Sequence, residues 1–269
     1  MKIIEHFDDI AVPLRNDEDY LKAELSMARD IQRELLMCTG VEGRNEFCVS
    51  VFVQPAMAIG GDFYDYFLID DDHLGFIIAD VSGKGVPAAM FMMRAKTIIS
   101  SISHNIERAD TFFNKLNNLL CANNDYSMFV TAVFGLLEIS TGKLTFANAG
   151  HNLPIIKRAN GVAEEVILKP GFVLGGWADI KFEQFSTQVN EGDLLLLYTD
   201  GLNDALGANE EFFGIERILN AVNSEENNSG MALLSKIKKD LVNFTGDVPQ
   251  QDDVAMFILE YFGAKDENF

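Results

Sequence analysis

Four short acidic motifs, far apart in the chain, carry the residues best suited to chemistry. They read Gly60-Gly61-Asp62, Asp80-Val81-Ser82-Gly83-Lys84-Gly85, Thr199-Asp200-Gly201 and Gln251-Asp252-Asp253. Each lies next to a run typical of a β-strand, and Mg²⁺ and Mn²⁺ prefer oxygen ligands of this kind. Clustered carboxylates without a cation would repel by about 4 kcal/mol per pair at 4 Å and an effective dielectric constant of 20. The motifs therefore either spread over the surface or form a metal site, and the residues alone leave both open.

The composition is that of a folded protein with an acidic surface. The chain has 269 residues, is 48% hydrophobic and carries a formal net charge of -20. It can bury a sizeable core, and its length allows one or two domains. Nucleic acid phosphates and anionic membrane surfaces would repel it, so we expect neither as a partner. No apolar stretch reaches about 18 residues, so the sequence predicts no membrane-spanning helix in this chain.

Cysteine usage indicates a reducing compartment. The three cysteines are Cys38, Cys48 and Cys121, and none lies in a CxxC pattern. This argues against a disulfide framework or a zinc site and favours the cytoplasm. The first 15 residues lack the basic and apolar regions of a signal peptide. That the chain is a fragment of a larger sensor protein stays open.

The N-terminal part predicts a helix followed by a linker. The helix is expected over residues 16–37, with an apolar series at coiled-coil spacing: Leu21, Leu25, Ala28 and Leu35. Gln32 interrupts this seam. Glycines in residues 39–46 predict a boundary. We therefore divide the chain into an N-terminal segment with a linker or regulatory helix (1–44), a domain (45–263) and a C-terminal tail (264–269). The helix either forms a homodimer or packs back on its own domain.

Beyond the linker, apolar runs and turn signals predict many strands with helices between them. Strands are expected over 47–53, 63–69, 74–79, 128–139, 143–148, 154–158, 163–168, 182–189, 194–199 and 254–261. Helices are expected over 85–103, 109–121, 215–222 and 231–244. Hairpin signals such as Asn160-Gly161 favour antiparallel sheets in an α+β arrangement.

Five motifs, in order, resemble one protein family. They are the four acidic motifs, with the first extending to Asp65 and the second to Ala89, and Asn148-Ala149-Gly150-His151-Asn152. Together they are similar to the SpoIIE/RsbU branch of the metal-dependent (PPM, type-2C) serine/threonine protein phosphatases, over roughly residues 47–262. Residues 28–32 also resemble the linker helix often found before this domain. The resemblance implies two packed antiparallel β-sheets flanked by helices, an αββα sandwich.

The resemblance also implies a site with two ions, Mn²⁺ or Mg²⁺. Asp80 matches the catalytic aspartate that bridges both metals. Asp200 and Asp252 match ligands of the first metal, while Asp62 and the backbone carbonyl of Val81 match positions at the second. Two such cations, about 3.5–4 Å apart, can share a water and lower its pKa. No side-chain nucleophile is then needed. Without the resemblance, Asp80 could instead be a helix-capping residue.

Other residues in the motifs are assigned supporting roles. Asp253 lies next to a predicted ligand. Gly83 and Gly85 permit the tight turn from strand to helix. Lys84 either reaches substrate phosphate or is exposed to solvent. His151 either orders the neighbouring loop through hydrogen bonds or donates a proton.

The family implies hydrolysis of phosphoserine or phosphothreonine on a protein. By analogy the substrate is a phosphorylated STAS-domain protein, an anti-sigma-factor antagonist in bacterial partner switching. Val173 and Asn203-Asp204 depart from the usual pattern of the branch and weaken the substrate assignment. One rival is a catalytically silent scaffold that binds a phosphoprotein. Another is a metal-dependent nuclease, against which the net charge of -20 argues.

Overall fold

The computed structural model describes residues 17–264, except 39, 42, 105, 160, 170 and 226–228. Residues 1–16 of the predicted N-terminal segment lie outside the described residues. So do residues 265–269 of the predicted C-terminal tail.

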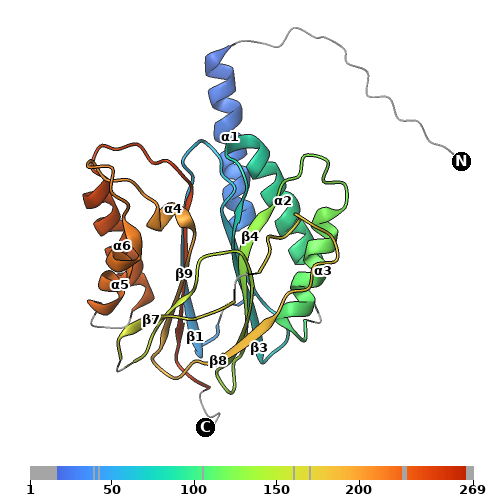
Figure 1. Ribbon diagram of the computed structural model, residues 1–269, viewed down its shortest axis with the longest axis vertical. Coiled ribbons are helices and arrows are strands. Elements are labelled where there is room, and N and C mark those ends of the chain that lie inside the picture. The colour runs from blue at the N-terminus through green and yellow to red at the C-terminus, as the bar shows by residue number, and fades with distance from the viewer. Residues whose placement is uncertain are drawn as a thin grey trace, which may run out of the picture.

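Two five-stranded sheets form the centre of the structure (Figure 1). The first has the order β1-β10-β9-β6-β7 and the second the order β2-β3-β4-β5-β8, with every pairing antiparallel. The strands of the first sheet are β1 (Phe47–Gln54), β6 (Ile155–Lys157), β7 (Ala163–Glu165), β9 (Leu194–Tyr198) and β10 (Val254–Tyr261). Those of the second are β2 (Phe63–Leu68), β3 (His73–Val81), β4 (Val130–Glu138), β5 (Lys143–Ala149) and β8 (Gln184–Gln188). The predicted α+β sandwich is confirmed.

Helices cover the outer faces of both sheets (Figure 1). α2 (Gly85–Ile102) and α3 (Ala109–Cys121) pack on the second sheet, while α5 (Gly214–Asn223) and α6 (Gly230–Thr245) lie against the first. A one-turn helix, α4 (Asp200–Asn203), which the sequence analysis did not expect, follows β9. Within the described residues, no helix is both long and apolar enough to pass through a bilayer.

The central strands are buried on both sides, which explains their nearly unbroken apolar sequences. In β10, Phe257 points between the sheets and stacks on Phe76 of β3, with ring centroids 5.2 Å apart. Its neighbours Met256 and Ile258 pack on the helical side with residues of α5 and α6. Successive side chains of a strand alternate between faces, so one apolar run supplies two cores.

The predicted N-terminal helix exists as α1 (Glu18–Leu36), and its predicted role in joining two copies stays a prediction. Leu21 and Leu35 are 52% and 40% exposed, whereas Gln32 and Leu36 are buried. The C-terminal half of α1 therefore packs on its own domain, while the first half projects beyond the layers (Figure 1). Gln32 does not merely interrupt an apolar stripe. Its Nε2 donates to the Gly60 carbonyl (2.8 Å), and its Oε1 accepts from the Gly60 amide (3.2 Å).

Candidate metal centre

The antiparallel pairings bring the acidic motifs to one end of the sandwich. Asp62 immediately precedes β2, and Asp80 is the penultimate residue of β3, whose end pairs with the start of β2. In the other sheet, Asp200 follows β9 and Asp252 precedes β10, at the end where these strands pair. Face-to-face packing of the sheets then places both sets of carboxylates together.

Burial and mutual repulsion make the carboxylates hard to ionise. Burial and the charge of Asp80 raise the pKa of Asp62 well above its usual range. Burial, with the charges of Asp200 and Asp252, raises the pKa of Asp80 to about 7. Burial and Asp252 also raise the pKa of Asp200. A cation among these groups would relieve the repulsion.

Thr199 holds Asp62 and links the two sheets. Its Oγ1 donates to Asp62 Oδ2 over 2.6 Å and accepts from the Ala255 amide of β10 over 2.8 Å. Thr199 is fully buried, and Asp62 is 3% exposed. The sequence analysis did not single out Thr199, although it is part of the Thr199-Asp200-Gly201 motif. The threonine fixes one Asp62 oxygen, and the Asp62 side chain also hydrogen-bonds with Asp80.

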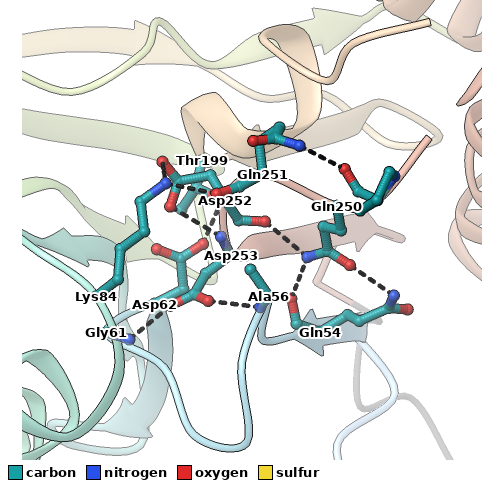
Figure 2. Close-up of polar contacts among 11 residues, drawn as sticks. Gln54, Ala56, Gly61, Asp62, Lys84, Thr199, Gln250, Gln251, Asp252 and Asp253 are labelled. Carbon is teal, nitrogen blue, oxygen red and sulfur yellow. Dashed lines mark hydrogen bonds and ion pairs between the residues drawn. The ribbon is translucent and has the colours of Figure 1, made fainter. Parts of the chain in front are cut away.

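Both carboxylate oxygens of Asp253 accept hydrogen bonds from the backbone of the loop before β2. Its Oδ1 accepts from the Ala56 amide and its Oδ2 from the Gly61 amide, both over 2.7 Å (Figure 2). A Cβ at Gly60 would lie 2.2 Å from Asp253 Oδ2, so this close approach requires glycine. Both oxygens are used in holding the loop that carries Asp62, an arrangement consistent with the predicted supporting role of Asp253.

Lys84 points into the acidic cluster. Its ammonium lies 2.8 Å from Asp252 Oδ2 and donates to the Gln251 carbonyl over 2.5 Å (Figure 2). It also opposes the rise in the pKa of Asp200. The side chain remains 45% exposed, so it faces both the carboxylates and solvent.

The turn around Lys84 depends on glycine, and it leads directly into α2. Gly83 and Gly85 have φ of +86° and +67°, values that other residues rarely adopt. The carbonyl oxygen of the buried Val81 lies close to Gly61, the residue before Asp62. A Cβ at Gly61 would lie 3.1 Å from this oxygen. Asp80 lies within β3, and the N-cap position of α2 is occupied by Lys84. The helix-capping interpretation of Asp80 is therefore wrong.

His151 is buried beside the strand that pairs with Asp80. Its Nδ1 lies 2.8 Å from Thr131 Oγ1, and Thr131 is opposite Asp80 in the β3–β4 register. Its backbone amide donates to Asn148 Oδ1 over 2.8 Å. Burial lowers the pKa of His151 to about 4, so the imidazole is neutral near pH 7. A neutral, hydrogen-bonded ring supports the ordering role better than the role of proton donor.

The donor set suits a hard cation, but it is not a ready-made cage. In the described part of the chain, no three His, Cys, Asp or Glu side chains converge closely enough to hold a metal ion as they stand. The side chains that meet here are carboxylates, with no thiol or imidazole among them, which is the chemistry of Mg²⁺ and Mn²⁺ sites. The residues fit such ions by donor type and charge, and the ligand assignments stay predictions.

Solved structures identify the fold. The chain superimposes on the SiaA-PP2C domain of Pseudomonas aeruginosa with a TM-score of 0.76 and 19% identity, covering 92% of this chain and all of that one. RsbX, solved in complex with magnesium, aligns with a TM-score of 0.62 and 17% identity over 82% of this chain and 98% of its own. The fold is therefore the PP2C-type phosphatase fold.

The sequence then gives the family. Residues 70–262 match the family described as Stage II sporulation protein E (SpoIIE), and the chain belongs to it. Protein IcfG of Synechocystis sp. (strain ATCC 27184 / PCC 6803 / Kazusa) is 30% identical over 265 residues, which cover 88% of this chain and 41% of IcfG. Phosphoserine phosphatase RsbU of Bacillus subtilis (strain 168) is 29% identical over 191 residues, 71% of this chain and 56% of RsbU. The chain thus spans about half the length of these relatives.

Proposed function

We propose that this protein is a metal-dependent phosphatase that hydrolyses phosphoserine or phosphothreonine on another protein. The observation that carries the proposal is the meeting of Asp62, Asp80, Asp200 and Asp252 at one end of a PP2C-type sandwich. Membership of the SpoIIE family and similarity to a phosphoserine phosphatase support it.

The same residues would hold two ions, Mn²⁺ or Mg²⁺. Asp80 would bridge them, Asp200 and Asp252 would bind the first, and Asp62 with the Val81 carbonyl would serve the second. Bound ions supply Lewis acidity and lower the pKa of water. The magnesium in the RsbX structure, which has the same fold, supports this assignment.

The chain's own groups position this chemistry. Thr199 orients Asp62, and Asp253 holds the loop on which Asp62 lies. In hydrolysis the water oxygen bonds to phosphorus, the ester P–O bond breaks, and the serine or threonine oxygen leaves with a proton. The Lys84 ammonium lies where it can approach phosphoryl oxygens as negative charge develops on them.

For the substrate we propose a phosphorylated STAS-domain protein in bacterial partner switching, acting in the cytoplasm. The similarity to RsbU supports the partner-switching context by analogy. We also propose that α1 regulates the domain and joins two copies through its exposed apolar residues. It already contacts the Asp62 loop through Gln32 and Gly60.

The test is turnover of p-nitrophenyl phosphate and of phosphorylated STAS proteins from the same source, with Mn²⁺ and with chelator. We expect metal-dependent hydrolysis of both. Binding of the phosphoprotein without turnover of either substrate would instead establish the silent scaffold.

A further inference from the structure

A groove lies beside the acidic cluster, between α6 and the segment that follows α4. Its volume is about 460 Å³, and its walls come from β1, residues 204–212, α6 and the loop before β10. Gly201 and Asp252 line this groove and also belong to the acidic motifs. The α6 groove, as we call it, therefore begins at the proposed catalytic centre and continues along α6.

The α6 groove has an apolar surface with exposed apolar side chains. Phe212 is 59% exposed and Val242 is 65% exposed, and both line the groove together with Leu206 and Leu241. Large apolar side chains exposed around a concave surface are typical of a binding site.

One wall is already formed without a ligand. In the segment after α4, the Phe213 amide donates to the Ala205 carbonyl (2.8 Å) and the Gly207 amide to the Glu211 carbonyl (2.9 Å). Gly207 packs so closely on Phe244 of α6 that a Cβ there would lie 2.9 Å from the ring. This segment is fixed to α6, so binding would need little reorganisation.

The opposite wall is also held by internal hydrogen bonds. The Gln250 side chain donates to the carbonyls of Gln54 (2.9 Å) and Asp252 (2.6 Å), and its own carbonyl oxygen accepts from Gln54 Nε2 (2.7 Å; Figure 2). These polar groups are satisfied within the protein. The groove therefore offers apolar contact more than free hydrogen-bonding groups.

The charge at the catalytic end selects the kind of occupant. Asp204 lines this end beside Asp252, which pairs with Lys84, and the whole chain carries a net charge of -20. Lys238, at the other side of the groove, places its ammonium over the Phe52 ring at 4.2 Å. A ligand that enters from the acidic end is favoured when it combines apolar side chains with a positive charge.

We propose that the α6 groove binds the segment of the phosphoprotein substrate next to its phosphorylated residue. This segment would carry a large apolar side chain a few residues from the phosphoserine, with Lys or Arg between the two, toward the acidic end of the groove. The proposal rests on the proposed function, because continuity with the catalytic centre places the phosphoserine at one end of the groove.

The test compares two phosphoserine undecapeptides in Mn²⁺, one with Leu three residues to either side of the phosphoserine and Arg next to each Leu, the other with Ala in place of Leu. The small ester p-nitrophenyl phosphate, which cannot reach along the groove, is the control substrate. The variant is Val242→Lys, and its matched control is Met231→Lys. Met231 is an equally exposed residue of α6 (63%) that does not line the groove.

We expect kcat/KM for the Leu peptide to exceed that for the Ala peptide by about tenfold, the worth of one buried apolar side chain. Val242→Lys should abolish this preference. It should leave turnover of the small ester within about twofold, because the ester does not reach Val242. Met231→Lys should change neither. Equal turnover of the two peptides, or a preference that survives Val242→Lys, overturns the proposal while hydrolysis of the small ester still upholds the phosphatase.

Two further outcomes separate the groove from the proposed function. If the protein hydrolyses nothing, the proposed function fails. The groove is then tested by fluorescence polarisation of the labelled peptides. Tighter binding of the Leu peptide than of the Ala peptide, lost in Val242→Lys, supports the proposed groove. If light scattering shows that Val242→Lys only dissociates a dimer and leaves the peptide preference unchanged, the groove belongs to a second copy of the chain and the proposal is wrong.

Discussion

Replacing Asp80 by Asn removes the charge at the centre of the acidic cluster. Asp80 lies near Asp62, Asp200 and Asp252, and its pKa is raised from 3.8 to about 7. The substitution keeps the size of the side chain and its place in β3. It therefore tests charge and metal binding rather than packing.

The structure predicts that Asp80→Asn is more stable than the wild type without metal, but gains less stability than the wild type when metal is added. A carboxyl whose pKa is raised by folding destabilises the folded state progressively as pH rises from about 4 to about 7. A rise of about three units corresponds to about 4 kcal/mol at pH 8. In chelator, Asp80→Asn should therefore be more stable than the wild type by up to about 4 kcal/mol at pH 8 and by almost nothing at about pH 3.5. Mn²⁺ should then stabilise the wild type much more than the variant.

Turnover should fall although the protein is folded and more stable. Loss of the bridging carboxylate is expected to reduce hydrolysis of p-nitrophenyl phosphate by at least about 10³-fold, equivalent to about 4 kcal/mol of transition-state stabilisation. Urea unfolding in chelator and in Mn²⁺, with circular dichroism, measures the stability. Asp71→Asn is the control, because Asp71 is exposed at the far end of the β2–β3 hairpin.

Two results would refute this reasoning. A folded Asp80→Asn protein with a near-normal rate would show that Asp80 is not the central ligand. A variant less stable than the wild type in chelator at pH 8 would show that burial and the neighbouring carboxylates do not raise the pKa of Asp80 as the structure indicates.

Four further predictions follow from the same structure. Activity should require Mn²⁺ or Mg²⁺, and free metal at 100 times its Kd should stabilise the fold by about 2.7 kcal/mol; full activity in excess chelator would contradict this. Gly201→Ala should cost about 1–3 kcal/mol in urea unfolding, because its Cβ would lie 1.9 Å from the Asp253 carbonyl; an unchanged midpoint would be evidence against this contact. The pKa of His151 is lowered to about 4 from an ordinary 6.5, so the free energy of unfolding should fall as pH falls from 6.5 to 4. His151→Gln should reduce this pH dependence of stability, and an unchanged dependence would exclude the histidine as its cause. Light scattering should show that the full chain is a dimer and that a chain starting at Asn45 is a monomer, and turnover should differ between the two. If both are monomers with equal turnover, the dimerising and regulatory roles of α1 are both wrong.

Much of the fold was predictable because local signals and burial agree. The helix expected over 109–121 is α3 (Ala109–Cys121), and the strands expected over 63–69 and 74–79 are β2 and β3, which pair as a hairpin. Motifs with an aspartate next to an apolar run marked the ends of β3 and β9. Such features depend on residues close in sequence, so the sequence is enough to predict them.

The role of Gln32 could not be predicted from its position in the helix. Helical spacing predicted an apolar seam through Leu21 and Leu35, because these residues repeat at coiled-coil intervals. The face that α1 buries instead carries Leu36 and Gln32, and the Gly60 backbone offers an amide and a carbonyl to the glutamine side chain. Without the tertiary contact, a polar residue in the helix is only an interruption.

The sequence by itself determined which acids are present and on which strand ends they lie. Only the tertiary structure decided what each acid does. Asp252 and Asp253 are neighbours in the chain, yet Asp252 pairs with Lys84 while both oxygens of Asp253 accept backbone amides. Both residues lie in the loop just before β10, where their side chains meet different segments of the chain. What each one meets is set by segments about 170 to 200 residues away in the sequence, which pack there when the two sheets come together.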